Sequence, residues 1–242
     1  MGQEQRPVDA RQIYLQITRN GPYLVHGRPP LRQEFILPND RGNSWEYGAG
    51  REFPTAGRDP VALCRCGHSR RAPFCDGAHR QAGFDGTETA SRAPILEGAK
   101  EYPGPNYVLL DNEAYCAFAR FCDAFGQVWN LVAEGEQLSD ELALREAFHC
   151  PAGRLMIRKR GSDELLEPQL APAIGVLEDP AIGCSGPLYL KGGIRVEGED
   201  GTSYEVRNRQ TLCRCGASAN KPFCNGAHAS VKYQDGIATE ES

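Results

Sequence analysis

The first apolar pattern in the chain is a period-two alternation near its start. Apolar residues alternate with polar ones over residues 13–17, a Gly-Pro pair follows at 21–22, and a second apolar run covers 23–27. Alternation on both sides of a short turn predicts a β-hairpin. A similar run, Gly-Pro-Leu-Tyr-Leu-Lys-Gly, stands at residues 186–192. The pattern therefore predicts a sheet-forming unit that occurs twice.

Turn-forming residues interrupt the first unit between its hairpin and residue 64. They include Pro38, Asn39, Gly42, Asn43 and the glycines at 48 and 50. Their turn chemistry predicts a loop insertion rather than another element. Trp45 and Tyr47 lie inside this segment, and we expect them to attach the loop to the body of the protein.

Helical spacing replaces the alternation in the middle of the chain. Behind Asn112, a good capping residue, apolar side chains recur at helical spacing. This predicts a helix from Glu113 past Phe125. A second helix is expected from Ser139 to Cys150, because a proline follows Cys150 and disfavours helical backbone before it.

Two strands and an overall fold class complete the prediction. Apolar runs at residues 155–157 and 174–177 predict strands around a polar turn. Helices and strands in this order favour an α+β fold, in which an α+β insert separates two small β-rich units. The expected parts are a first repeat at 1–93, an insert at 94–183 and a second repeat at 184–242.

Composition and charge exclude several classes of protein. The hydrophobic fraction of 40% suits a modest core, and the net charge of -5 with interspersed charges is not typical of a nucleic-acid binder. The N-terminus has no apolar signal-peptide region, and no run is long enough to span a membrane. We therefore expect a soluble, cytoplasmic protein with no nucleic-acid or membrane partner.

Six of the ten cysteines lie in two copies of one pattern, Cys-x-Cys-x8-Cys-x3-His. The donors are Cys64, Cys66, Cys75 and His79 in the first copy, and Cys213, Cys215, Cys224 and His228 in the second. Disulfides are the alternative, but the missing signal peptide and the repeated histidine favour metal. Equal spacing with different intervening residues predicts two copies of one metal site.

The spacing within each copy indicates how the donors are grouped. A bend can turn Cys64 and Cys66 onto one metal, and Cys75 and His79 would share a face if a short helix begins near Pro73. Two donors in each half suit a [2Fe-2S] rhomb, which needs two ligands for each iron. A structural zinc site with three Cys and one His is the alternative, although zinc cysteines are usually spaced Cys-x2-4-Cys.

Both stretches resemble the CDGSH iron-sulfur domain of the NEET, or mitoNEET-like, proteins. The matching residues are Cys64, Cys66, Ser69, Pro73, Cys75, Asp76, Gly77, Ala78 and His79, and Cys213, Cys215, Ser218, Pro222, Cys224, Gly226, Ala227 and His228. The second copy departs from the pattern at Asn225, where the family has Asp. The resemblance implies two [2Fe-2S] clusters, each bound by three Cys and one His.

The same resemblance implies an assembly and a function. Family members with one such domain form homodimers by strand exchange, so two copies in one chain are similar to the monomeric pseudo-dimer of the mitochondrial-matrix type. The implied functions are electron transfer, redox sensing or cluster transfer, with a redox partner or an apo-acceptor protein. The sequence contains no catalytic triad, phosphate-binding loop or dinucleotide-binding fingerprint, so we do not expect an enzyme. A zinc-stabilised interaction module and an electron-transfer subunit of an oxidoreductase remain as alternatives.

Residues beside the ligands carry further expectations. Arg65 and Arg214 lie between paired cysteines, where each either donates a hydrogen bond toward cluster sulfur or is simply exposed. Ser69 and Ser218 are expected to hold the loop, because serine commonly makes such turns.

The middle segment also resembles a divergent single-cluster ferredoxin-like domain, through Cys116-x5-Cys122 and Cys150-Pro151. This resemblance implies a third iron-sulfur cluster on Cys116, Cys122 and Cys150. Two features argue against it: residues six apart on a helix do not converge, and the stretch has no glycine. We therefore expect a ferredoxin-like frame that lost its cluster, with Cys184 as the candidate fourth ligand and buried structural cysteines as the alternative.

Overall fold

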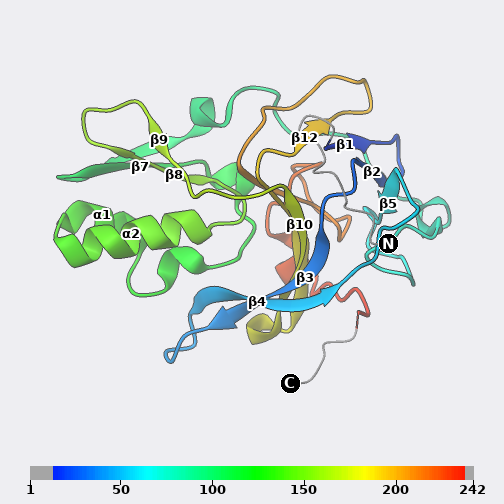
Figure 1. The fold of residues 1–242 in the computed structure, drawn as a ribbon, viewed down its shortest axis with the longest axis horizontal. Coiled ribbons are helices and arrows are strands. Elements are labelled where there is room, and N and C mark those ends of the chain that lie inside the picture. Colours follow the sequence, from blue (N-terminus) through cyan, green and yellow to red (C-terminus); the bar gives the residue numbers. More distant parts are fainter. Residues whose placement is uncertain (1–12, 238–242) are drawn as a thin grey trace, which may run out of the picture.

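The computed structural model describes residues 13–237, which form a mostly β protein with few helices (Figure 1). One sheet has the strand order β12-β1-β2-β5. Its strands are β1 (Tyr14–Ile17), β2 (Tyr23–His26), β5 (Val61–Leu63) and β12 (Arg195–Glu197). Strands β1 and β2 pair antiparallel, with Leu15 opposite Val25, so the hairpin predicted near Gly21 is confirmed.

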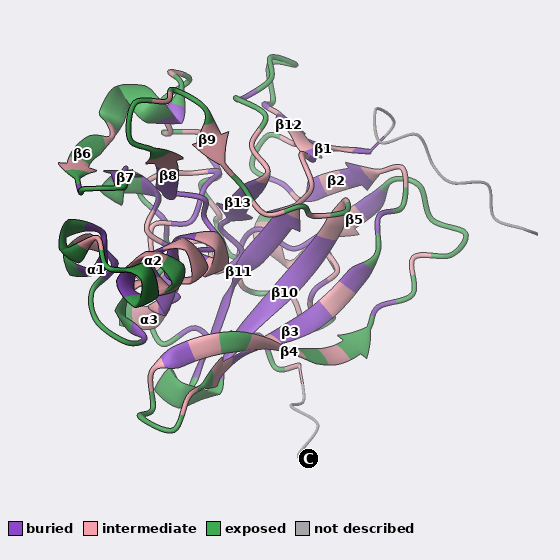
Figure 2. Ribbon diagram, turned by 60° about the vertical axis from the view of Figure 1, so that its left-hand side comes forward, coloured by how far each residue is buried: buried purple, intermediate pink, exposed green. Residues whose placement is uncertain are grey.

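A second sheet has the strand order β13-β11-β10-β3-β4. Its strands are β3 (Leu31–Pro38), β4 (Ser44–Glu52), β10 (Ala173–Asp179), β11 (Cys184–Lys191) and β13 (Arg209–Leu212). The purple colour of β10, β11 and much of β3 in Figure 2 marks this sheet as the centre of the buried core.

The two sheets exchange strands between the two halves of the chain. Strand β12, from the second half, pairs parallel with β1 of the first half. In return, β3 of the first half pairs parallel with β10 of the second. Each sheet therefore has three strands from one half of the chain, completed by β12 in the first sheet and by the β3–β4 hairpin in the second.

The predicted loop insertion in the first unit is wrong, because its flanks form the β3–β4 hairpin. Only residues 39–43 make the turn, where Asn39 Oδ1 accepts hydrogen bonds from the backbone N–H groups of Arg41 and Asn43. Tyr47 donates a hydrogen bond to the carbonyl of His149 (2.6 Å), and Trp45 packs edge-on to Phe125. These aromatic residues therefore attach a strand, and not a loop, to the middle segment.

A third sheet, β6-β7-β8-β9, belongs to the middle segment and packs against two helices. Its strands are β6 (Lys100–Pro103), β7 (Tyr107–Asp111), β8 (Leu155–Lys159) and β9 (Leu165–Leu166), and the helices are α1 (Val128–Glu134) and α2 (Gln137–His149). Figure 1 shows α1 and α2 side by side on one face of β7 and β8. The second predicted helix is confirmed, although it begins two residues before Ser139.

The two strands predicted at 155–157 and 174–177 are both present, but they do not form a hairpin with each other. The first lies in β8, whereas the second lies in β10 and pairs with β11 and β3. Period-two patterns predict strands well and partners poorly, because pairing depends on residues far away in the chain.

The helix predicted from Glu113 past Phe125 is wrong. The segment contains two short 3-10 turns, η4 (Glu113–Tyr115) and η5 (Phe121–Asp123), and Phe118 and Arg120 between them have φ of 55° and 62°. Left-handed residues with side chains do not continue an α-helix. Asn112 does cap the first turn, since its side chain accepts a hydrogen bond from the N–H of Ala114.

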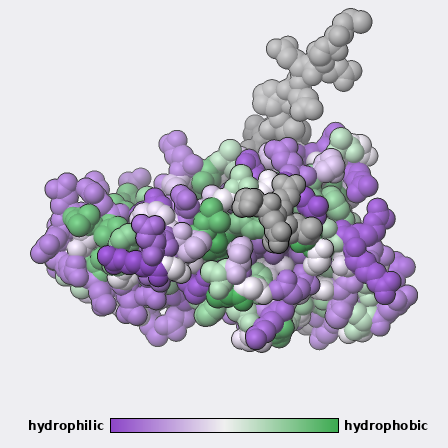
Figure 3. Space-filling model, turned by 90° about the horizontal axis from the view of Figure 1, so that it is seen from below, coloured by the Kyte–Doolittle hydropathy of each residue, from purple (hydrophilic) through white to green (hydrophobic). Residues whose placement is uncertain are grey.

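The remaining short elements are η2 (Ala78–Arg80), η3 (Ile95–Gly98), η6 (Pro180–Ile182) and α3 (Ala227–Ser230). On the face shown in Figure 3, hydrophobic residues form small groups among hydrophilic ones. Within residues 13–237, no helix is both long enough and apolar enough to cross a membrane.

Candidate metal centres

The first candidate centre is a loop that follows β5. Its two halves are held together by hydrogen bonds from the N–H of Cys64 to Pro73 O (2.8 Å) and from the N–H of Cys75 to Ala62 O (2.9 Å). Cys64 Sγ lies 3.7 Å from Cys66 Sγ, and Cys75 Sγ lies 3.5 Å from His79 Nδ1. The four predicted donors therefore lie as two close pairs.

The second loop follows β13 and repeats this arrangement. The N–H of Cys213 donates to Pro222 O (2.8 Å), as Cys64 does in the first loop. Cys213 Sγ lies 3.7 Å from Cys215 Sγ, and Cys224 Sγ lies 3.4 Å from His228 Nδ1. The pairing of the donors is thus the same in both copies, as the repeated spacing predicts.

The short helix predicted near Pro73 is wrong. The helical turns begin later, after Gly77 in the first loop and after Gly226 in the second. Both glycines are left-handed, with φ of 88° and 82°, and a residue with a side chain would be strained there. The histidine is thus brought back to its cysteine by a turn between the two residues.

The pair distances match those expected for donors on one tetrahedral metal ion. With metal–sulfur bonds of about 2.3 Å and metal–nitrogen bonds of about 2.0 Å, two donors lie about 3.5 to 3.8 Å apart. Across residues 13–237, no group of three or more His, Cys, Asp or Glu side chains is arranged to hold one metal ion. Each loop therefore presents two separate two-donor sites rather than one four-donor site.

Backbone N–H groups stabilise one thiolate in each loop. A hydrogen bond from Cys66, helped by the N–H groups of Ser69 and Gly67, lowers the pKa of Cys64 to about 6. The corresponding hydrogen bonds lower the pKa of Cys213 to about 6. Since metal binding requires thiolates, one donor of each cysteine pair is already favoured in the charged form.

The two loops touch each other. Cys66 and Cys215 form an antiparallel bridge, and a Cβ atom on Gly67 or Gly216 would lie 2.5 or 2.6 Å from the carbonyl oxygen of the opposite cysteine. Only glycine permits this approach. Neither glycine was among the residues expected to matter, although the order Cys-x-Cys-Gly in both copies was a signal for them.

Tyr23 ties the first hairpin to the second loop. Its hydroxyl is fully buried and donates to the carbonyl oxygens of Cys213 (2.8 Å) and Pro222 (3.1 Å). Leu188 stands at the matching position of the second hairpin, so the first loop receives no such hydroxyl. No short-range pattern marks Tyr23, because its partners lie 190 and 199 residues away.

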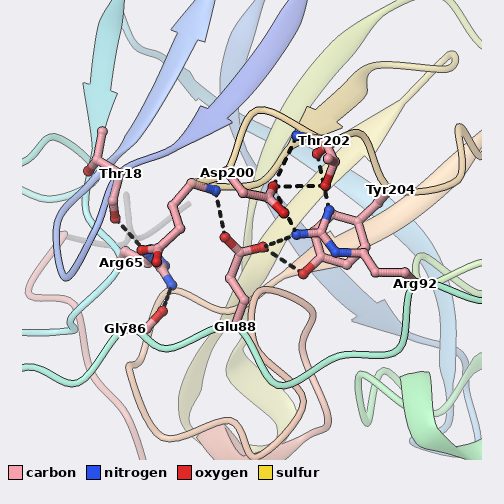
Figure 4. Close-up of polar contacts among 9 residues, drawn as sticks. Thr18, Arg65, Gly86, Glu88, Arg92, Asp200, Thr202 and Tyr204 are labelled. Atoms are coloured by element: carbon pink, nitrogen blue, oxygen red, sulfur yellow. Dashed lines mark hydrogen bonds and ion pairs between the residues drawn. The ribbon is translucent and has the colours of Figure 1, made fainter.

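The alternative that Arg65 and Arg214 are exposed is wrong, and a hydrogen bond from either residue toward cluster sulfur stays a prediction. Both are buried, at 2% and 1% exposure. Arg65 donates to the carbonyls of Thr18 and Gly86, as Figure 4 shows. The same view shows that Glu88 beside it joins the linker after the first loop to residues 199–204 of the second half. Arg65 therefore holds backbone segments together.

Arg214 holds charged groups as well as backbone. Its guanidinium donates to the carbonyls of Gly186 and Leu177, each at 2.7 Å. It also pairs with Glu178 (2.6 Å) and with Asp235, both of which are buried. Arg214 is therefore the cation of a buried three-residue ion network, which Arg65 is not.

The serine expectation is confirmed. The hydroxyl of Ser69 donates to Phe74 O (2.6 Å), and that of Ser218 donates to Phe223 O (2.7 Å). Each oxygen also accepts a hydrogen bond from the N–H two residues later. Both serines therefore hold the loop.

The cysteine-histidine half of the site differs between the loops. Cys75 and His79 are only partly buried, whereas Cys224 and His228 are buried, at 2% and 3% exposure. Burial, together with nearby Arg214 and Arg120, lowers the pKa of His228 to about 4. The cysteine-histidine half of the second site is therefore shielded from water, whereas that of the first site is partly exposed.

The remaining candidate cysteines lie in the middle segment. Cys116, Cys122 and Cys150 line one hollow, together with Arg154. Cys184, the candidate fourth ligand, does not line this hollow and instead begins strand β11.

Comparison with protein families matches two segments of the chain, residues 20–80 and 185–229, to the family described as iron-binding zinc finger, CDGSH type. Each segment contains all four donors of one loop. Comparison with curated proteins and with solved structures gave no match. Each loop described above thus lies in one of the two segments that match this family, and the two are called the CDGSH-type loops below.

Proposed function

We propose that each loop binds one [2Fe-2S] cluster through three cysteines and one histidine. The proposed ligands are Cys64, Cys66, Cys75 and His79 for one cluster, and Cys213, Cys215, Cys224 and His228 for the other. The observation that carries the proposal is the pairing of donors at 3.4 to 3.7 Å in both loops. Each pair suits one iron of a two-iron rhomb.

The same pairing disfavours a structural zinc. Four ligands of one tetrahedral zinc would all lie about 3.5 to 3.8 Å from one another. Both loops bring their donors together two by two, and no group of three or more donors in residues 13–237 fits one ion. Binding zinc would therefore require the two halves of each loop to close together.

We further propose that the two repeats form an intramolecular pseudo-dimer and that the protein is a monomer. The exchange of β3 and β12 between the sheets supports this proposal. So does the bridge between Cys66 and Cys215, which places the two loops back to back. A second chain is not needed to complete either sheet.

A [2Fe-2S] cluster accepts and returns one electron when bound. We propose that the protein acts in electron transfer, redox sensing or cluster transfer, with a redox partner or an apo-acceptor protein, and that it is not itself an enzyme. The partly exposed Cys75 and His79 are where such a partner can reach a ligand. Cys224 and His228 are buried, so Cys215 is the one proposed ligand of the second site that is partly exposed.

Metal and sulfide analysis of matched variants tests this proposal. Cys64→Ser and Cys213→Ser should each lower the content of the anaerobically purified protein by about two irons and two sulfides per chain. The visible colour should fall in both variants and should be bleached by dithionite. A colourless protein that contains zinc and no sulfide, and loses zinc on either substitution, would refute the proposal.

A further inference from the structure

A second hollow, which we call the Arg207 hollow, lies between the middle segment and the second half of the chain. Its walls come from η3, β8 and β9 on one side, and from residues 205–209, which lead into β13, on the other. It measures about 520 Å³ with its open mouth included, which is within the range of about 300 to 1,000 Å³ that small-molecule sites occupy. None of the eight proposed cluster ligands lines it.

A glycine lets the two walls meet. Gly153 is left-handed, with φ of 60°, and a Cβ atom there would lie 2.5 Å from the carbonyl oxygen of Arg209. Only glycine permits this approach. The join between the walls is thus built from backbone contacts, which makes the hollow a fixed feature of the fold.

Much of the wall is apolar. The apolar lining residues are Ile95, Leu96, Met156, Leu165 and Val206. Leu96 is 43% exposed and Val206 is 55% exposed, so both remain open to water at the hollow. Covering such side chains is favourable, and a ligand with an apolar body would do so.

Arg207 lines the same hollow as a cation without an anion. Its Nη1 donates to the carbonyl of Ala152 (3.2 Å), and its guanidinium lies over the rings of Tyr115 and Phe223, at 4.6 and 4.8 Å from their centroids. Its Nη2 is buried and has no acceptor within residues 13–237, nor does Arg207 form an ion pair with any Asp or Glu of that range. Buried charges are normally paired, because an unpaired one is costly.

Two other arginines of the second half show the usual arrangement. Arg209 pairs with Glu167 (2.8 Å), and Arg214 pairs with Glu178 (2.6 Å). Burial opposes the charge of both, yet their carboxylate partners raise the pKa of each guanidinium. Burial instead lowers the pKa of Arg207. Arg207 is therefore buried at the same kind of cost but lacks the anion that offsets it.

The carboxylates of the hollow are engaged elsewhere. Glu167 is held by Arg209, and Glu205 accepts a hydrogen bond from the N–H of Ile95 (2.8 Å). Neither forms an ion pair with Arg207, although the charge of Glu205 is felt there. One unpaired cation beside two carboxylates suits a ligand with a single negative charge. A phosphate, which carries up to two, suits it less well.

We propose that the Arg207 hollow binds a small monocarboxylic acid with an apolar body. The carboxylate pairs with Arg207 and gives Nη2 the acceptor that it lacks, while the body covers Leu96 and Val206. The guanidinium turns slightly toward the hollow for this, since Nη2 is otherwise closed to water. Because Phe223 under Arg207 directly precedes Cys224, the bound acid lies beside the second CDGSH-type loop.

Calorimetric titration with a matched pair of probes tests the site. Octanoate and octanamide have the same apolar body, but only octanoate carries a charge. The full-length, anaerobically purified protein should bind octanoate with a dissociation constant in the millimolar range or below, and octanamide about tenfold more weakly. Arg207→Gln should weaken octanoate binding about tenfold and leave octanamide binding unchanged.

The first CDGSH-type loop supplies the control variant. Arg58 lies over the ring of Phe74, at 5.4 Å from its centroid, much as Arg207 lies over Phe223, but Arg58 does not line the hollow. Arg58→Gln should therefore leave octanoate binding unchanged. An equal loss in Arg58→Gln and Arg207→Gln would show that the charge acts without a site and would overturn the proposal.

Two more variants at the hollow change the charge in opposite directions. Glu205→Gln removes a like charge and keeps an acceptor for the N–H of Ile95, so it should strengthen octanoate binding about threefold. Val206→Asp adds a negative charge at an exposed residue and should weaken it, and it replaces Arg207→Gln if that variant does not fold. The proposal is overturned if octanoate fails to bind at millimolar concentrations, binds no tighter than octanamide, or binds Val206→Asp and the wild type equally.

Discussion

The two CDGSH-type loops have the same donor geometry in different surroundings. Their cysteine pairs are both 3.7 Å apart, and their cysteine-histidine pairs are 3.5 and 3.4 Å apart. Yet His79 is partly exposed, whereas His228 is buried, and Cys116 and Phe118 of the middle segment lie close to Gly226 in the same loop. The local motif thus sets which atoms meet, while the rest of the fold sets which of them water or a partner protein can reach.

The largest difference should come from the two buried arginines. Arg214→Ala leaves Glu178 and Asp235 buried without their cation, which should destabilise the protein by about 3 to 5 kcal/mol. Arg65→Ala leaves only carbonyl groups unpaired and should cost about 1 to 3 kcal/mol. Thermal unfolding followed by circular dichroism compares them, and equal losses would show that the ion network adds nothing.

The pH dependence of this difference sharpens the comparison. Burial raises the pKa of Glu178 from 4.5 to about 7 even though Arg214 opposes the shift. A carboxyl whose pKa is raised by folding favours the folded state at low pH, and that contribution is lost as pH rises from about 4.5 to 7. Without Arg214 the loss is larger, so the penalty of Arg214→Ala should be greater at pH 8 than at pH 5.

Matched glycine substitutions probe the contact of Cys116 and Phe118 with the second loop. Gly77→Ala and Gly226→Ala both place a side chain at a left-handed residue, at a cost of about 1 to 2 kcal/mol. A Cβ at residue 77 meets open space, whereas at residue 226 it meets Cys116 and Phe118 at 3.1 Å. Gly226→Ala should therefore cost about 1 kcal/mol more in thermal unfolding. Equal losses of stability in the two variants would mean that Cys116 and Phe118 move away from residue 226 without an energetic cost.

Iron release compares the accessibility of the two sites. The Cys213→Ser variant keeps the donors of the first loop, and the Cys64→Ser variant keeps those of the second. The first loop should lose iron to a ferrous chelator about tenfold faster, which corresponds to about 1.4 kcal/mol in the barrier. Release at the same rate from both loops would contradict the importance of burial at His228.

The smallest expected effect comes from Tyr23, whose hydroxyl donates hydrogen bonds to the second loop. Tyr23→Phe removes a buried hydroxyl that donates to Cys213 O, while Pro222 O keeps the N–H of Cys213. The loss should be about 1 kcal/mol in stability. Tyr23→Phe should also speed iron release from the second loop and leave release from the first loop unchanged. A larger effect on the first loop would show that the contact acts through the fold as a whole.

The pairing of the eight proposed ligands could be predicted because its signal is local. Both loops keep the donor spacings that the sequence shows, and the structure pairs the donors as the spacing predicts. The hairpin before the first loop and the helix that ends at His149 were also readable from short patterns. These features depend on residues close together in sequence, where periodicity and turn chemistry are informative.

The errors arose where distant contacts decide the structure. Phe118, Phe121 and Phe125 recur at helical spacing, but the structure buries Phe121 and exposes the other two. The β3–β4 hairpin was read as a loop because its turn residues are prominent, while β3 is stabilised by pairing with β10 about 140 residues away. The exchange of strands is likewise a property of pairing and has no mark in the local pattern.

Anomalous diffraction at the iron and zinc absorption edges of crystals of the intact protein tests the central claim most directly. The account predicts two iron atoms at each CDGSH-type loop, one between Cys64 and Cys66 or their counterparts, and one between Cys75 and His79 or theirs. One zinc ion at each loop, bound by all four donors at once, would contradict it.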